Sequence, residues 1–269
     1  MNTRLLAYSG IFVAAFGWAL SPIFMRWLSG VYDPYTQSLV RYLSAIVVLV
    51  PYSLWFFGQE TVALFRRPRG LLGLAAVNVV DQILWTIGCY HTTATQANLI
   101  TKLQVAFVIL FSFLFFREER AVIRSAYYLG GTALGIFGVV AIVTAHSAAS
   151  LLPRSDFATF LLIVVALGWA IYAVWGKHLV MRTHPVPMFT VVAVHSTVGF
   201  AVVACVAGDL DSVWKASIQS TLLAFVSGVF PIAIAHCTFH YGQKHLGSAF
   251  ATSITLIGPL ITYFLALLI

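Results

Sequence analysis

Long apolar runs separated by short polar stretches dominate the chain. Nine runs can be marked off at charged, Pro or Gly positions, and each reaches the ~20 residues that an α-helix needs to cross a bilayer. Strands of a membrane barrel would need only about 10 residues of alternating polarity. The pattern therefore predicts an all-α polytopic membrane helical bundle, with spans at 5–28, 35–57, 70–90, 94–116, 124–145, 157–180, 186–207, 217–241 and 247–269.

Charge is scarce and lies mainly in the short connections between these runs. Hydrophobic residues make up 61% of the chain and charged residues 9%, with a formal net charge of +7. In a soluble domain this basic excess would suggest nucleic acid, but basic loops between apolar runs indicate membrane topology instead. We expect a lipid bilayer and no nucleic acid as partners. The longest connections, around 57–70 and 146–157, leave room for a single membrane domain, residues 1–269.

The distribution of Lys and Arg predicts the orientation. A cytoplasmic N-terminus places ten basic residues inside and three outside, which is the bias typical of membrane proteins. The inside set is Arg4, Arg66, Arg67, Arg69, Arg117, Arg120, Arg124, Lys177, Arg182 and Lys244, and the outside set is Arg26, Arg154 and Lys215. We expect a multi-pass protein in a cell membrane of the bacterial inner-membrane type.

Two segments of the chain repeat each other. Residues 16–28, FGWALSPIFMRWL, match 167–179, LGWAIYAVWGKHL, and a second match pairs YHTTATQANLI from Tyr90 with KHLGSAFATSI from Lys244. The shared positions include Gly17/Gly168, Trp18/Trp169, Arg26/Lys177 and His91/His245. Five spans separate the copies, and an odd number reverses their direction, so the pattern predicts an inverted-topology repeat. We expect one repeat in residues 1–146 and a second, incomplete one in 147–269.

These segments resemble the EamA-type members of the drug/metabolite transporter superfamily. The resemblance is carried by the two Gly-Trp pairs, by Arg41, by the segment from Thr95 to Glu118 with LFFREE at its end, and by Thr252 to Leu267 with Gly258-Pro259-Leu260. It implies ten helices in two inverted five-helix halves. Val105 stands where the second repeat has Pro259, and the chain stops at Ile269, before the expected tenth helix. A truncated chain and a nine-span variant both remain open.

The third run carries one polar and aromatic stripe. Asn78, Asp81, Gln82 and Trp85 lie at a spacing that places them on one face of a helix. An ionised carboxylate at the bilayer centre costs about 2.5 to 3.5 kcal/mol on insertion scales and usually faces a cavity or a partner. Asp81 is the leading candidate for proton or cation handling. The alternative is a permanent ion pair, with Arg41 or Lys102, that locks helices together.

Arg41 and Lys102 lie about two turns inside predicted spans, away from the span ends. A cation left free would attract a substrate carboxylate or phosphate, through the bidentate fork of Arg or the compact charge of Lys. For Arg41 we favour a structural role, such as a side chain extended towards the outer headgroups. For Lys102 we favour a functional one.

Aromatic and imidazole side chains complete the candidate binding set. Trp18, Trp169 and Trp85 would line a cavity, while His195 and His236 would carry hydrogen bonds or protons. His236 and His240 stand one helical turn apart, but no third ligand is evident, so we expect interhelical hydrogen bonds rather than a metal site. Gly131 and Gly135 have GxxxG spacing in the fifth run, which indicates close helix packing or, as the alternative, a homodimer face.

The function that these features favour is secondary transport by alternating access, with no cofactor. The sequence contains no P-loop, no paired-carboxylate motif and no HExxH motif, so we expect no enzyme activity and no catalytic residue. The family resemblance implies export of amino acids or similar small polar or aromatic metabolites; proton coupling is left open. A non-transporting membrane assembly partner and an intramembrane lipid-modifying enzyme remain the alternatives.

Overall fold

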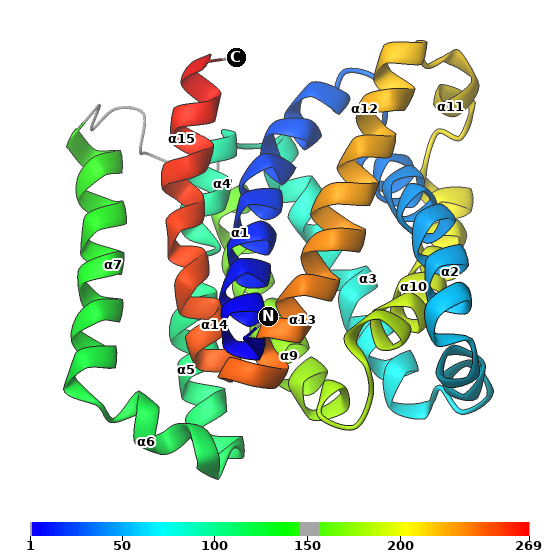
Figure 1. The fold of residues 1–269 in the computed structure, drawn as a ribbon. Helices are drawn as coiled ribbons and strands as arrows, with labels where there is room; N and C mark the ends of the chain where they lie inside the picture. Colours follow the sequence, from blue (N-terminus) through cyan, green and yellow to red (C-terminus); the bar gives the residue numbers. More distant parts are fainter. Residues whose placement is uncertain (1, 146–155, 269) are drawn as a thin grey trace.

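The computed structural model describes residues 2–145 and 156–268, and all regular structure among them is helical (Figure 1). Among these described residues, eight segments are long and apolar enough to cross a membrane. These are α1 (Thr3–Leu28), α2 (Pro34–Arg66), α3 (Arg69–Tyr90), α4–α5 (Ala94–Phe115), α9 (Asp156–Val180), α10 (Pro185–Ala207), α12–α13 (Ile218–Leu246) and α14–α15 (Ser248–Leu267). The predicted fifth span forms α7 (Ala126–Ala145). The prediction of an all-α polytopic membrane bundle is therefore confirmed.

Short helices complete the connections. They are α6 (Arg120–Ile123), α11 (Asp211–Lys215) and the 3₁₀ turn η1 (Arg117–Glu119). The predicted long connection at 57–70 is wrong for most of its length, because α2 continues to Arg66 beyond a kink at Phe57 (φ −136°, ψ 31°). Thr61 bridges this kink by donating its hydroxyl to the carbonyl oxygen of Phe57 at 2.9 Å. The other long connection, 146–157, lies almost entirely outside the described residues.

Three of the spans are interrupted. α4 (Ala94–Ile100) ends and α5 (Leu103–Phe115) begins around Thr101 and Lys102, and a 3₁₀ turn, η3 (Thr255–Ile257), separates α14 (Ser248–Ile254) from α15 (Gly258–Leu268). Between α12 (Ile218–Gly228) and α13 (Ala235–Leu246), a π-helical stretch, η2 (Val229–Ile234), contains Pro231, which has no backbone N–H to donate. Interruptions of this kind free backbone groups at the midplane, where transporters bind their substrates.

The helices contact one another in reciprocal pairs. α1 packs along α13 as α3 packs along α9, and α1 contacts α15 as α9 contacts α5. Likewise α12 packs on α2 and α3 on α10, with α2 against α10 at the centre. Such reciprocity is what an inverted repeat predicts. The predicted repeat boundary at residue 146 falls outside the described residues and stays a prediction.

Apolar side chains cover both the inside and the outside of the bundle. Tyr42, Tyr172, Phe200 and Phe239 are buried in the main core, which joins α2, α3, α9, α10 and α13. Many equally apolar side chains point outward, and Val206 for example is 84% exposed. A surface of this kind is stable against lipid rather than water.

α7 stands at one edge of the bundle beside α15 (Figure 1). A Cβ added at Gly135 would lie 3.2 Å from Leu256, whereas one at Gly131 would meet no atom within 4 Å. Of the predicted GxxxG pair, one glycine thus serves internal packing. The homodimer face remains a prediction.

Candidate substrate cavity

A cavity in the middle of the bundle gathers eight of the ten candidate residues. Three are charged, namely Arg41, Asp81 and Lys102, and three are indoles, namely Trp18, Trp85 and Trp169. Gln82 and His236 complete this set. The cavity thus combines both signs of charge with large apolar rings, the combination expected of a site for a small polar ligand.

Asp81 occupies the α3 side of this cavity. Its carboxylate rests against the backbone of α9 at Gly168, where any Cβ would collide with it. The side chain is 5% exposed, and across residues 2–145 and 156–268 it makes neither an ion pair nor a hydrogen bond. The alternative of a permanent ion pair with Arg41 or Lys102 is therefore wrong, because neither cation lies within 4.0 Å of it.

Arg41 lies deep in the bundle rather than at its surface. The residue is 2% exposed, and its guanidinium donates to the Ser21 hydroxyl at 2.8 Å and to the Ser227 hydroxyl at 3.1 Å. It donates also to the Ser227 carbonyl oxygen at 3.4 Å. The expectation that Arg41 extends towards the headgroups is wrong. α1 and α12 supply oxygens close enough to hold it in the interior, where it still lines the cavity.

Lys102 sits where α4 gives way to α5. Its ammonium group has no hydrogen-bond or ion-pair partner among the described residues. A Cβ on Gly258 would lie 3.3 Å from the Lys102 Nζ, so the start of α15 borders this cation closely. The neighbouring Asn98 donates to the Thr262 hydroxyl at 2.6 Å and so joins α4 to α15. The two interrupted spans therefore meet beside an unpaired positive charge.

The aromatic wall is built by Trp18 and Trp169, whose rings pack edge-on with centroids 4.8 Å apart. Trp18 donates its Nε1–H to the Pro231 carbonyl oxygen at 3.0 Å, in the π-helical stretch. The Nε1 of Trp169 has no partner in the part of the chain that the structure describes. His236 stacks on Phe189 with ring centroids 4.6 Å apart, and its Nδ1 lies 3.0 Å from the Ile232 carbonyl oxygen.

Two candidate residues lie away from the cavity. Asn78 shares the α3 stripe with Asp81, but it pairs with the Tyr42 hydroxyl at 2.7 Å and the Ser196 hydroxyl at 2.9 Å. The His195 Nδ1 lies 2.7 Å from the Val191 carbonyl oxygen of its own helix. Their inclusion in the site is not supported by their positions. Both instead satisfy hydrogen bonds within or between helices.

Several lining residues were not predicted from the sequence. Ser21, Asn98, Thr101 and Gln104 line the cavity beside the charged set. The predicted interhelical bonding of the histidine pair holds for His240, whose Nε2 lies 3.1 Å from the Tyr172 hydroxyl. Uncharged polar residues are common in membrane spans, so composition alone could not distinguish the cavity-lining residues from polar residues at ordinary helix contacts. This applies to Ser21, Asn98, Thr101 and Gln104.

Fold and cavity together define the class, a multi-pass helical membrane protein whose interrupted spans surround a charged and aromatic cavity. The sequence profile of the EamA-like transporter family matches residues 5–144 and 156–269. The chain therefore belongs to this family, as the resemblance implied, and it is a membrane transporter of the drug/metabolite transporter type.

Individual relatives agree with this assignment. An uncharacterized transporter of Archaeoglobus fulgidus is 27% identical over 172 residues, or 61% of this chain, and the match spans 55% of that protein. A WAT1-related protein of Arabidopsis thaliana is 25% identical over 268 residues, covering 88% of this chain and 70% of its own length. One crystal structure superposes with a TM-score of 0.77 at 16% identity, covering 99% of this chain and 87% of the other. This last likeness is one of fold.

Proposed function

We propose that the chain is a secondary carrier for small zwitterionic metabolites of the amino-acid type. The observation that carries this proposal is the pair of unpaired opposite charges, Asp81 and Lys102, lining one cavity among tryptophan rings. An isolated charge inside a span is costly, and it is retained where a ligand or ion completes it. A substrate ammonium group would bind Asp81 and a substrate carboxylate would bind Lys102.

The indoles give this site its apolar surface. Trp85 and Trp169 face the same cavity as Asp81 and offer ring faces for an aromatic or aliphatic side chain. A cationic substrate group near such rings gains further from the cation–π interaction. The site therefore suits small amino acid-like molecules better than sugars, which lack the charges.

Transport follows from movement of the two repeats, 1–146 and 147–269, about the cavity. The interrupted spans α4–α5, α12–α13 and α14–α15 border the cavity through Lys102, Pro231 and Gly258. Half-helices of this kind rearrange at low cost because their midplane backbone bonds are already broken. We place the protein in a cell membrane with its N-terminus on the cytoplasmic side, and we propose that it exports its substrate. Export is coupled to protons, which Asp81 binds and releases when no substrate ammonium group is bound to it.

Reconstitution into liposomes tests this proposal with three matched solutes: an amino acid, the amine left when its carboxylate is removed, and the acid left when its amino group is removed. We expect flux of the amino acid that responds to a pH gradient, and at least about tenfold weaker binding of both analogues, since each forfeits one charge contact. His195→Gln, outside the cavity, should transport normally. Equal binding of all three solutes would contradict the assignment of the charges.

A further inference from the structure

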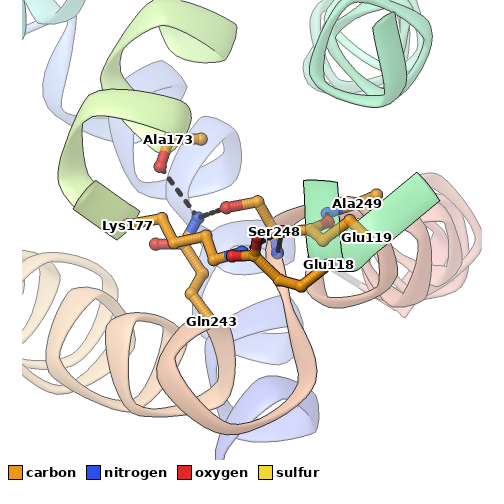
Figure 2. Close-up of polar contacts among 7 residues, drawn as sticks. All are labelled: Glu118, Glu119, Ala173, Lys177, Gln243, Ser248 and Ala249. Carbon is orange, nitrogen blue, oxygen red and sulfur yellow. Dashed lines mark hydrogen bonds and ion pairs between the residues drawn. The ribbon is translucent and has the colours of Figure 1, made fainter. Parts of the chain in front are cut away.

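A second polar cluster lies at the end of the bundle that also holds the N-terminus (Figures 1 and 2). We call it the polar junction and define it by Glu118 and Glu119 of η1, Lys177 of α9, Gln243 of α13 and Ser248 of α14. Lys177 is 3% exposed and pairs with Glu119 at 2.5 Å and with Glu118 at 3.1 Å. The Lys177 Nζ also lies 3.8 Å from the centre of the Phe116 ring.

Glu119 joins two segments at once. Besides Lys177, its carboxylate accepts hydrogen bonds from the backbone N–H groups of Ser248 at 2.9 Å and Ala249 at 2.8 Å. These groups open α14 and have no partner within the helix. The chain passes the carboxylate at Gly247, whose φ of +90° suits glycine and where a Cβ would lie 3.0 Å from the carboxylate carbon. The side chain thus ties the end of α5 to α9 and to the start of α14.

Gln243 of α13 also contributes hydrogen bonds to the polar junction. Its amide group donates to the Ala173 carbonyl oxygen of α9 and to the Ser248 hydroxyl, each at 3.1 Å (Figure 2). Its Oε1 lies 2.8 Å from the His240 Nδ1. One connected set of polar contacts therefore holds η1, α9 and the corner between α13 and α14, three regions that are far apart in sequence.

The junction lies on one side of the cavity. Along α9 it is about 12 Å from Trp169, at 1.5 Å per residue. Tyr172, Phe239 and His240 fill the space towards it and are all fully buried. Cavity residues such as Ser21 and Asn98 lie instead towards the opposite ends of their spans. The cavity is therefore sealed on the junction side by packed rings and, beyond them, by the Lys177 and Glu119 charges.

Among the described residues, no buried ion pair joins the helices at the opposite end of the bundle. Arg26, which matches Lys177 in the repeat, donates to the Tyr90 carbonyl oxygen at 2.9 Å and makes no ion pair within residues 2–145 and 156–268. A buried ion pair is weak evidence for stability, because its desolvation offsets its attraction, whereas it can specify one arrangement of helices over another. The junction has this character, since its residues come from η1, α9, α13 and α14.

We propose that Lys177 and Glu119 form a gate that holds the cavity closed at the junction end and parts when the carrier opens there. The proposal rests on the carrier function argued above. Opening separates the Lys177 ammonium from the Glu119 carboxylate, frees the start of α14 and exposes the buried flank of α9 around Ala173.

Cysteine labelling tests this gate directly. Ala173 is fully buried, so Ala173→Cys, in a chain whose Cys89, Cys205 and Cys237 are replaced by alanine, reports opening by its reaction with a membrane-impermeant maleimide. In the neutral pair Lys177→Met with Glu119→Gln we expect labelling at least about tenfold faster, because the closed state loses its charge pair. The matched control is the exposed pair Lys215 and Asp211, 4.0 Å apart, whose Met and Asn variants should label like the parent.

A more conservative variant keeps the test informative if the neutral double variant fails to fold. Glu119→Asp keeps the charge but shortens the side chain, so it cannot reach Lys177 and both N–H groups together, and labelling should rise roughly threefold. Unchanged labelling in folded protein of either variant would overturn the gate. Labelling needs no substrate, so the two proposals can fail separately. Faster labelling without any substrate flux would support opening at the junction and contradict the carrier function. Substrate flux with unchanged labelling would support the carrier function and rule out the gate.

Discussion

The two sides of the cavity are built alike but differ in charge. On one side Gly17 of α1 faces α13, where a Cβ would lie 3.3 Å from the Ala235 side chain. On the other, Gly168 of α9 faces α3, where a Cβ would strike the Asp81 carboxylate. The repeat thus places an alanine opposite one glycine and an acid opposite the other, so a shared scaffold carries a carboxylate at only one of these two contacts.

The cations follow the same rule. Continuing the matched segments pairs Lys102 with Leu256 and Arg41 with Val192, so both cavity cations belong to the first repeat and have apolar counterparts. A symmetric scaffold can rock between two similar states, whereas an asymmetric charge set binds a substrate in one orientation. The difference teaches that movement and recognition are separable in this molecule.

The largest effect is expected from Asp81. Asp81→Asn keeps the shape of the side chain but removes the charge and the exchangeable proton, so flux should fall by at least about tenfold and its pH dependence should vanish. Asp211→Asn, on an exposed acid, is the control and should change neither. Unaltered pH dependence, measured in liposomes with an imposed gradient, would remove Asp81 from the coupling.

Lys102 and Leu256 give the next comparison. Lys102→Met should weaken substrate binding by about tenfold through loss of the carboxylate contact, while the melting temperature changes little because the ammonium group has no protein partner. Leu256→Met, at the apolar counterpart, should leave binding intact. Isothermal titration and thermal melting measure the two quantities. Comparable losses of both affinity and melting temperature would instead mark Lys102 as a structural charge.

The two glycines offer a third comparison. Gly168→Ala forces the Asp81 carboxylate aside and should cost about 1 to 3 kcal/mol of stability, with weakened substrate binding. Gly17→Ala meets a methyl group at 3.3 Å and needs only a small shift, so it should cost less. Denaturation and binding of both variants decide the point. A larger loss of stability and binding in Gly17→Ala than in Gly168→Ala would show that the position of Asp81 does not depend on its contact with Gly168.

The tryptophans should separate stability from binding. Trp18→Phe removes the hydrogen bond to Pro231 and should cost about 1 kcal/mol, whereas Trp169→Phe removes an N–H that has no protein partner and should be nearly neutral in stability. Thermal denaturation of the two variants provides the measurement. A greater loss in Trp169→Phe would point to an acceptor for its N–H in the folded protein.

The smallest effect concerns Asp33, at the end of the bundle opposite the polar junction. Its carboxylate accepts the Tyr35 N–H at 2.8 Å, which caps α2, and the Asp209 N–H at 2.8 Å. Partial burial raises the pKa of Asp33, but hydrogen bonds from Thr36, Asp209 and Tyr35 lower it more, so the pKa lies below its ordinary value.

Because the folded state lowers this pKa, the stabilisation is present above the ordinary pKa of an aspartate and is lost as the pH falls through the lowered one. Asp33→Ala should cost up to about 1 kcal/mol near neutral pH, a loss that shrinks in acid. Melting curves from neutral to acidic pH test this sign. A loss independent of pH would contradict it.

Much of the site could be predicted from the sequence. Asp81 and Lys102 stand out because an ionised group in an apolar run is costly, and Trp169 because it repeats Trp18. The pairing state of these groups could not be predicted. Whether Asp81 meets Arg41 depends on how α2 and α3 rotate, and the structure turns Arg41 towards Ser21 and Ser227 instead. Asn78 lies on the predicted stripe, yet Tyr42 and Ser196 engage it.

Local properties of the chain determined the membrane spans, their helical form and the residues that stand out as costly, because hydropathy and helix length depend on neighbouring residues alone. The tertiary structure decided which charges remain unpaired and which segments Glu119 joins, because α9, α14 and η1 are remote in sequence and meet only through packing. A local pattern cannot encode such distances. The chemistry of this protein therefore follows from its helix contacts as much as from its residues.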